Sequence, residues 1–418
     1  MKKINIFRGD KVLWVVFFLL SIISLIAVYS SIGLHANSLD GKTPTGMFLK
    51  HFAIVAGTYV AIIVLSNINY RNFSRFALLG YFGSIALLVL TFVMVKIGGG
   101  SAADGSGAAR WIRFGAFQLQ PSEIAKVVLL IFVARMLTLK KESVATKEFF
   151  WSILVYIGIV VGLVVFENFS TAALIFLGCY IMMYLGGVNR KRWWLLLAVI
   201  VVGVSLYMGY KYFQYKKSVD TAIELKDESL IKRGNTWGGR IYRWLNPDPE
   251  AVTQENRARM AVARGKFFGQ HVGSTIHGRL MTQAHNDFIY AVIIEETGAL
   301  GGIVVFALYA IFYLRCVRLA KKCPGRFGKL TVAGIGTVIY IQALVNMGVA
   351  VGALPVTGQT LPFISYGGTA YLFLGAGVGV IQAVAVDTNR QAMAAKKGYA
   401  LPEPEKELEI VESENKEL

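Results

Sequence analysis

The stretch Gln283-Ala284-His285-Asn286-Asp287-Phe288-Ile289-Tyr290 closes a polar segment and opens an apolar one that runs to about residue 315. The apolar run is long enough to cross a bilayer as a helix. Asp287 therefore lies at the predicted start of a membrane-spanning helix, where a charge is costly and needs a reason. Two reasons fit this position, a helix cap and a catalytic base.

Apolar runs of the same kind recur along the whole chain. The 418 residues are 55% hydrophobic and 16% charged, a balance that excludes an ordinary soluble protein. We predict an all-α polytopic membrane protein with about ten transmembrane helices. The expected spans lie near residues 12–33, 48–66, 74–96, 121–138, 150–166, 171–187, 193–212, 287–315, 330–352 and 366–386.

Basic residues predict how these spans are oriented. Lysines and arginines precede the first run and recur in every second connection, as the positive-inside rule expects of cytoplasmic segments. Residues 1–11 are then a cytoplasmic N-terminus, and residues 388–418 are a disordered cytoplasmic tail. Residues 12–387 form the transmembrane domain, with a large extracytoplasmic loop at residues 213–286 between spans 7 and 8.

The large loop is strongly basic, within a chain whose net charge is +18. Long loops are exempt from the topology rule, so this excess does not oppose the orientation. It fits either an anionic ligand on the outer face or anionic lipid headgroups. The lysines and arginines of the loop include Lys216, Lys217, Lys232, Arg233, Arg240, Arg243, Arg257, Arg259, Arg264, Lys266 and Arg279.

The segment Gln120-Pro121-Ser122-Glu123 opens the expected fourth span. Proline suits a first helical turn, and Glu123 is favoured near a helix N-terminus. Lys126 lies one turn deeper and can pair with Glu123 at i,i+3. The pair either locks this helix in place or presents a cation to a substrate groove.

Other titratable residues suggest weaker sites. Glu295 and Glu296 are expected in the eighth span, about 12 Å below Asp287. There they either pair with basic or polar groups inside the bundle or form part of a proton relay. The histidines of the large loop match no zinc spacing, so they predict no metal site.

Several segments resemble, in the right order, the motifs of the SEDS family of polytopic peptidoglycan glycosyltransferases. The resemblance extends over about residues 10–387. The segments that carry it are Gly107-Ala108-Ala109-Arg110-Trp111-Ile112 with Gln120–Lys126, Arg240 with Asn246-Pro247, Arg264-Gly265 with Gly269, Ala284–Ile289 with Glu295-Glu296 and Gly298, and lastly Asn346, Pro355–Gly358 and Leu361-Pro362-Phe363-Ile364-Ser365-Tyr366-Gly367-Gly368.

The chain also departs from the family pattern. Ala109 replaces the first of two arginines, Glu167-Asn168-Phe169-Ser170-Thr171 replaces Gln-Pro-Asp-Leu-Gly-Thr, and Thr282-Gln283 replaces Pro-Glu. The loop near His277–Arg279 is one residue short, so no phosphate-binding role is carried over to that stretch. Val28-Tyr29-Ser30-Ser31 is more similar to the division branch of the family than to its elongation branch.

The resemblance implies a reaction. The family polymerises lipid II, a disaccharide-peptide on undecaprenyl pyrophosphate, at the outer face of the cytoplasmic membrane. By resemblance, Asp287 is the base that takes a proton from the acceptor's sugar hydroxyl, a role worth roughly 10²–10⁴ in rate. The departing pyrophosphate needs positive charge. The residues expected to bind substrate or pyrophosphate are Arg110, Lys126, Arg240, Arg264, Glu123, His285 and Ser365.

The resemblance also implies cofactors, partners and a location. Mg²⁺ or Mn²⁺ could assist the leaving group, although the sequence contains no evident ligand cluster. The expected partners are lipid II, a class B penicillin-binding protein transpeptidase, other division proteins and membrane lipids, but no nucleic acid. The expected location is the bacterial cytoplasmic (inner) membrane, as a multi-pass protein at the division septum. The alternatives are a lipid II flippase or transporter, an elongation-type polymerase that controls cell shape, and a scaffold for division proteins.

Overall fold

The computed structural model describes residues 7–32, 43–97, 112–114, 117–225, 237–248, 251, 253–281 and 284–397. Within these residues, ten helices of 17 residues or more form the molecule's bundle. They are α1 (Lys11–Ile32), α2 (Pro44–Asn67), α3 (Tyr70–Ile97), α4 (Pro121–Leu139), α5 (Lys147–Glu167), α6 (Phe169–Leu185), α7 (Arg190–Leu225), α12 (Ile289–Lys322), α13 (Arg326–Ala350) and α14 (Gly368–Lys396). Between α7 and α12 lie three shorter helices, α9 (Trp237–Leu245), α10 (Gln254–Gly265) and α11 (His277–Leu280).

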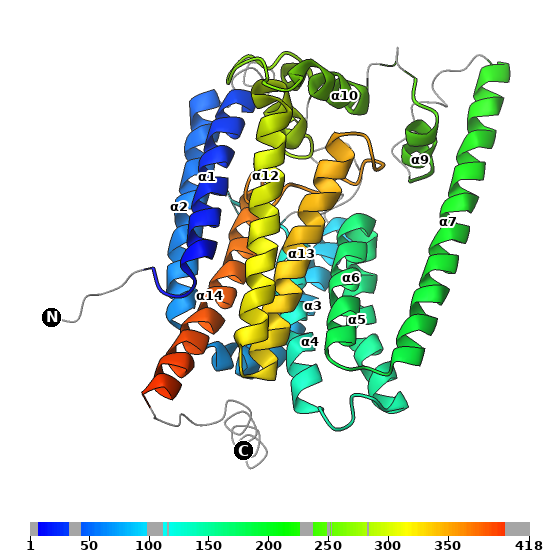
Figure 1. Cartoon of the computed structure of the whole chain (residues 1–418). Coiled ribbons are helices and arrows are strands. Elements are labelled where there is room, and N and C mark those ends of the chain that lie inside the picture. The colour runs from blue at the N-terminus through cyan, green and yellow to red at the C-terminus, as the bar shows by residue number, and fades with distance from the viewer. Residues whose placement is uncertain are drawn as a thin grey trace.

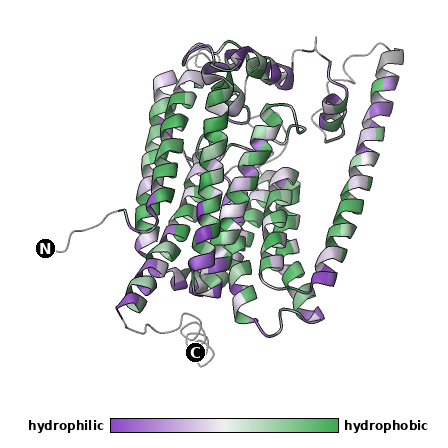
Figure 2. Ribbon diagram, in the orientation of Figure 1, coloured by the Kyte–Doolittle hydropathy of each residue, from purple (hydrophilic) through white to green (hydrophobic). Residues whose placement is uncertain are grey.

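The predicted fold class, a polytopic helical membrane protein, is confirmed. Eight of the long helices have the length and apolar composition to cross a membrane, and α6 is a shorter apolar helix. α4 coincides with the remaining predicted span, although it carries Glu123, Lys126 and Arg135. Hydrophobic residues follow these helices along most of their length, whereas hydrophilic residues gather over α10 and at the ends of the bundle (Figure 2). Before α4, the strands β1 (Ile112–Phe114) and β2 (Phe117–Leu119) form a short antiparallel pair.

The two ends of the bundle differ (Figure 1). α9 and α10 lie at one end, which we call the loop end. α1 begins and α14 finishes toward the opposite end, which we call the terminal end. A large loop on the side opposite both termini is the arrangement that the charge pattern predicts.

Two predicted boundaries are wrong because helices continue beyond their apolar runs. α7 extends to Leu225, so the first part of the predicted loop is helical. α14 extends to Lys396, so residues 388–396 are helical instead of part of a disordered tail. Both extensions contain lysine and alanine, which favour helix without needing a lipid environment. The predicted tail beyond residue 397 and the first six residues of the chain lie outside the described residues.

The helices pack in two different ways. α14 packs on α2, α13 on α12 and α4 on α3, and these contacts form the hydrophobic core. α7 packs mainly on α9 instead, and no residue of its apolar window is buried. Gly238 allows the close approach of α9, because a Cβ there would lie 2.3 Å from the carbonyl oxygen of Lys211. Tyr242 of α9 adds ring contacts with Tyr212 and Tyr215.

The apolar run of α12 consists of two helical segments. Gly298 has φ 74° and ψ −177° and interrupts the helix. This backbone conformation is essentially restricted to glycine. The carbonyl groups of Glu295 and Glu296 accept hydrogen bonds from the backbone N–H groups of Gln270 and His271 instead of continuing the helical ladder.

The two segments fold back on each other. We call residues 289–297 the first arm and residues 299–322 the second arm. The Tyr290 hydroxyl on the first arm donates to the Gly302 carbonyl on the second arm at 3.0 Å, although these residues would be about 18 Å apart along a straight helix. A Cβ on Gly302 would also lie 2.9 Å from Cγ1 of Ile294. The chain therefore turns back sharply between the arms.

This turn corrects the predicted depth of Glu295 and Glu296. One continuous span would place them about 12 Å deeper than Asp287. Instead, the first arm carries them to the loop end, where both contact the segment between α10 and the first arm. Asp287 precedes the first arm and therefore lies deeper in the bundle than either glutamate.

Candidate active site

The loop that carries Asp287 is held at three successive carbonyl groups, those of residues 285–287. In that order, they accept hydrogen bonds from the N–H of Tyr366 at 2.8 Å, the hydroxyl of Ser365 at 2.6 Å and Nδ2 of Asn346 at 2.8 Å. These donors come from α13 and from the segment that precedes α14. The position of Asp287 is thus fixed from outside its own loop, as a catalytic group requires.

The Asp287 side chain is not a helix cap. α12 begins at Ile289, its N-cap residue is Phe288, and no side chain makes a cap hydrogen bond there. The cap interpretation is therefore wrong, because the helix starts too late for Asp287 to reach the capping position. The carboxylate instead lines a cavity, where its Oδ2 lies 3.8 Å from the position that a Cβ on Gly358 would take.

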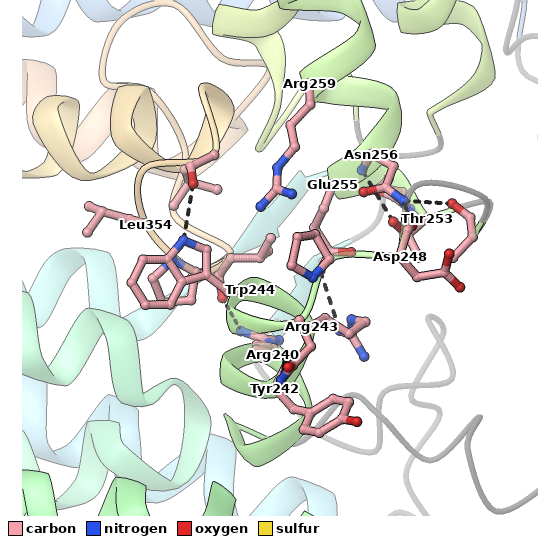
Figure 3. Close-up of a pocket in the computed structure, with 18 of the residues that line it drawn as sticks. Arg240, Tyr242, Arg243, Trp244, Asp248, Thr253, Glu255, Asn256, Arg259 and Leu354 are labelled. Carbon is pink, nitrogen blue, oxygen red and sulfur yellow. Dashed lines mark hydrogen bonds and ion pairs between the residues drawn. The ribbon is translucent and has the colours of Figure 1, made fainter. Parts of the chain in front are cut away.

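The cavity beside Asp287 has a volume of about 580 Å³, which lies within the range of small-molecule sites. Its walls come from α7, α9, α10, the Asp287 loop, the end of α13 and the segment after α13 (Figure 3). The residues that line it include Arg240, Tyr242, Arg243, Trp244, Asn246, Glu255, Asn256, Arg259, Asp287, Phe288 and Val356.

Arginines face this cavity from two helices (Figure 3). Arg240 of α9 donates to the carbonyl of Val356 at 3.2 Å. Arg243, one turn further along α9, pairs with Glu255 at 3.4 Å. Arg259 projects from α10. A carboxylate and guanidinium groups around one cavity suit a substrate that loses a proton and carries an anionic group.

A second polar cluster lies outside the cavity and supports the first arm. Glu295 pairs with Arg264 at 2.9 Å and accepts a hydrogen bond from the Thr275 hydroxyl. The backbone N–H groups of residues 276–278 also donate to it, at 3.0–3.2 Å. We call these residues the loop brace. The Glu295 side chain is fully buried, which is tolerable because its oxygens are satisfied by these donors.

Further contacts hold the first arm against α1 and the loop. Glu296 accepts hydrogen bonds from the Ser30 hydroxyl of α1 and from the N–H of Gly273, the latter at 3.1 Å. A Cβ on Gly265 would lie 2.0 Å from the carbonyl oxygen of Ile294. The loop backbone and the first arm therefore touch directly, and the loop end has a defined structure around the cavity.

Comparison with known proteins assigns the family. A family model described as a cell cycle protein, covering FtsW, RodA and SpoVE, matches residues 10–390. The chain belongs to this family. This range includes every element from α1 to most of α14, and with them the cavity and the loop brace.

Curated FtsW/RodA/SpoVE relatives align with nearly the whole chain. A probable peptidoglycan glycosyltransferase FtsW of Geobacter metallireducens is 33% identical over 383 residues, which cover 90% of this chain and 94% of the relative. Stage V sporulation protein E of Bacillus subtilis is 30% identical over 383 residues, covering 89% and 95% of the two chains.

Solved structures of the family share the fold. A chain of a peptidoglycan synthase complex superposes with a TM-score of 0.67 at 23% identity, covering 91% of this chain and 98% of that chain. RodA of Thermus thermophilus superposes with a TM-score of 0.63 at 20% identity, covering 91% and 97%. This chain therefore shares the overall fold of these structures.

The residues predicted from the family motifs separate into distinct places. Arg240 and Asp287 meet in the cavity. Ser365 and His285 lie behind the Asp287 loop instead: Ser365 bonds it, and the buried His285 ring lies 5.5 Å from the ring of Tyr366. Neither residue lines the cavity, and Ser365 helps to hold the loop that carries Asp287.

Glu123 and Lys126 form the predicted ion pair, but inside the bundle. Nζ of the fully buried Lys126 lies 2.9 Å from both carboxylate oxygens of Glu123 and 3.0 Å from Oε1 of Gln342. Gln342 in turn donates to the carbonyl of Thr360. Neither member of the pair lines the cavity. The geometry therefore favours an ion pair that locks α4 in place over a cation presented to a substrate groove.

Two predicted arginines do not line the described cavity. Arg264 is part of the loop brace, where its guanidinium forms an ion pair with Glu295 at 2.9 Å. This contact gives Arg264 a role in positioning the first arm, and its pyrophosphate-binding role stays a prediction. Arg110 lies outside the described residues.

Sequence reasoning did not single out Arg243, Arg259 or Trp244, which also line the cavity. Arg240 and Arg243 are three residues apart on α9, a spacing that places both on one helix face and offered a usable signal. Nothing in the sequence marked Arg259 among the other arginines of the loop.

The described residues contain no group of three or more histidine, cysteine, aspartate or glutamate side chains placed to hold a metal ion. Asp248, Glu255 and Asp287 line the same cavity without forming such a cluster. The donor set of the described residues therefore does not fit a metal held by the protein alone.

Proposed function

We propose that this protein polymerises lipid II into glycan strands at the outer face of the bacterial cytoplasmic membrane during septal cell-wall synthesis. It is an enzyme, a peptidoglycan glycosyltransferase of the FtsW/RodA/SpoVE family. The observation that carries the proposal is the meeting of Asp287 and Arg240 in one cavity at the loop end of a membrane bundle. A lipid-linked substrate requires a site within reach of the membrane, and this cavity meets that requirement.

The proposed reaction gives each of these two residues a task. Asp287 accepts the proton of the acceptor's sugar hydroxyl as that oxygen attacks the anomeric carbon of the donor strand. A new glycosidic C–O bond forms, the bond from the anomeric carbon to the diphosphate breaks, and the lipid diphosphate leaves with the bonding electrons. Arg240 stabilises the charge that develops on the leaving diphosphate.

The loop brace and the locking pair serve this reaction indirectly. The brace fixes the first arm, and the first arm begins two residues after Asp287. The Glu123–Lys126 pair reaches Gln342 on α13, one turn from Asn346, which holds the Asp287 carbonyl. Fixed geometry matters because small displacements of a general base lower the rate strongly.

The proposal includes a partner and a location. The superposed synthase complex indicates that such folds act in assemblies, and a class B penicillin-binding protein supplies the transpeptidase here. Other division proteins and membrane lipids are further partners, and the proposed location is the division septum. Depletion of the protein in growing cells tests the division role: filaments are expected, and rounded cells would indicate elongation instead.

The direct test is polymerisation of labelled lipid II by the purified full-length protein in detergent, with and without a cognate class B penicillin-binding protein. Glycan polymer is the expected product, because the reaction needs no sealed compartment. A protein that makes no polymer with the partner present, yet moves lipid II across sealed vesicles, is a transporter and overturns the proposal.

A further inference from the structure

Arg259 is a cavity arginine that the proposed mechanism does not use (Figure 3). Within the described residues, no hydrogen bond or ion pair engages its side chain. The other cavity arginines differ: Arg243 pairs with Glu255 at 3.4 Å, and Arg240 donates to a backbone carbonyl at 3.2 Å. A guanidinium that faces a cavity and has no partner in the described part of the chain is available to bind an anion.

The Arg259 side chain is held from two sides. Ala258 and Ala261, its neighbours on α10, are buried and fix the helix. On the opposite side, Gly352 lies so close that a Cβ there would be 2.7 Å from the Arg259 Nε and 3.4 Å from Cγ and Cδ. The side chain therefore crosses a gap that only glycine leaves open. A group ordered in advance loses little conformational freedom on binding.

The segment of residues 352–358, which follows α13, sets the order of the cavity's charged groups. Arg259 lies against its first residue, and Arg240 donates to a carbonyl in its second half. The Asp287 carboxylate lies beside its last residue. Six residue steps span at most about 20 Å. Along this segment the order is thus Arg259, Arg240 and Asp287.

The proposed polymerisation needs two lipid-linked diphosphates at the same time. The donor's diphosphate is bonded to the reacting anomeric carbon, so it must lie near Asp287. The acceptor's diphosphate is separated from the reacting hydroxyl by the disaccharide, so it must lie two sugar rings away. One site therefore needs two cationic positions, a near one and a far one.

We propose that Arg259 binds the diphosphate of the acceptor, the lipid-linked disaccharide, while Arg240 faces that of the donor. This assignment rests on the proposed function. Arginine suits the task because its planar fork binds two phosphate oxygens at once. The far position needs a cation that the protein does not itself neutralise, and Arg259 meets that condition within the described residues.

Kinetics with separate donor and acceptor test the assignment. A lipid-linked glycan oligomer serves as donor, lipid II serves as acceptor, and the rate of one addition is measured. Arg259→Ala should raise the KM for lipid II about 10- to 100-fold, since a hydrogen bond to a charged group is lost, and leave the KM for the oligomer unchanged. Arg257→Ala is the matched control, because it removes the same charge from the same helix outside the cavity lining.

Two kinetic outcomes overturn the assignment. A wild-type KM for lipid II in Arg259→Ala means that the arginine does not hold the acceptor. An equal rise in both KM values means that it does not distinguish acceptor from donor.

Binding of farnesyl diphosphate, a soluble lipid diphosphate, separates this inference from the proposed function. In titrations of the full-length protein in detergent, Arg259→Ala should weaken binding by about tenfold, and Arg257→Ala should not. If the wild-type protein polymerises no lipid II but binds farnesyl diphosphate more tightly than Arg259→Ala does, Arg259 is an anion-binding residue and the proposed polymerase function is wrong. An Arg259→Ala isotherm equal to that of the wild type overturns the anion position itself.

A second variant reaches Arg259 without altering it. Gly352→Ala places a Cβ 2.7 Å from the Arg259 Nε and should weaken farnesyl diphosphate binding as Arg259→Ala does. Gly273→Ala is its control, since Gly273 also has positive φ (87° against 77°) but nothing within 4 Å of an added Cβ. Equal binding by both glycine variants, with both folded, contradicts the proposed contact.

Discussion

The loop brace and the cavity contain the same chemical groups but use them differently. In the brace, Glu295 receives a guanidinium, a hydroxyl and backbone N–H groups, and its side chain is fully buried. In the cavity, Asp287 and Arg259 line an open volume of about 580 Å³. The difference shows that burial among protein donors marks the structural carboxylate, Glu295, whereas a position on a cavity wall marks the candidate catalytic one, Asp287.

The largest effect on folding is expected at the turn between the arms. Gly298→Ala forces a Cβ to within 2.2 Å of the Phe267 carbonyl oxygen, in a backbone conformation with φ 74°. Because only backbone movement can relieve this contact, we expect a loss of at least about 4 kcal/mol in the free energy of unfolding. Folded yield and thermal unfolding in detergent measure it.

Gly203→Ala is the control for that variant, since an added Cβ there meets nothing within 4 Å. Alanine favours helix over glycine by up to about 1 kcal/mol, so Gly203→Ala should be as stable as the wild type or more so. If Gly298→Ala unfolds at the same temperature as the wild type, the claim that α12 turns back sharply at Gly298 is wrong.

Glu295→Ala should break the brace. The change leaves Arg264 and the N–H groups of residues 276–278 without their acceptor, and loss of one buried partner costs about 3 kcal/mol. Arg264→Ala should cost less, because that side chain is 29% exposed and Glu295 keeps its other donors. Thermal unfolding of both variants tests the order, and equal stability of Glu295→Ala and wild type would refute the brace.

Arg240→Ala should affect turnover without affecting folding. Losing the cation beside the leaving diphosphate should lower kcat about 10- to 100-fold. The kcat of Arg240→Lys should lie between those of Arg240→Ala and the wild type. Lysine keeps the charge but loses the planar group, which lies 5.5 Å from the Trp237 ring centroid. Initial rates of lipid II polymerisation measure this, with Arg279→Ala as the control in the same loop. Equal rates for Arg240→Ala and Arg279→Ala would remove Arg240 from the mechanism.

Ser365→Ala should have the smallest effect. The Ser365 hydroxyl donates to the Asn286 carbonyl at 2.6 Å and accepts from the Leu361 N–H at 2.8 Å. Their loss should cost about 1–2 kcal/mol in stability and lower the rate modestly by loosening the Asp287 loop. A rate loss without any change in unfolding temperature would instead assign Ser365 a direct role in binding.

Much of the fold could be predicted because membrane crossing imposes long apolar runs. The expected spans coincide with helices, and the charged connections gave an arrangement consistent with termini opposite the loop. The turn at Gly298 was missed because hydrophobicity is the same on both of its sides. Only a positive φ distinguishes that glycine, and φ is not visible in composition. The helical end of α7 was missed because polar residues there were read as loop.

The candidate site could be predicted in part. The motif around Asp287 and the arginine of α9 indicated a carboxylate and a cation on the outer side, and the structure places both in one cavity. Which loop arginines the protein itself neutralises depends on partners distant in sequence: Arg264 meets Glu295, and Arg243 meets Glu255. Sequence spacing cannot supply such pairings.

The central claim is that Asp287 performs chemistry and does not maintain the fold. The most direct test compares single-turnover polymerisation and unfolding temperature in wild type and Asp287→Asn. Asparagine keeps the shape of the side chain but cannot accept the proton as a carboxylate does, so the rate should fall by roughly 10²–10⁴ while the unfolding temperature stays unchanged. An Asp287→Asn protein that polymerises lipid II at the wild-type rate would contradict the claim.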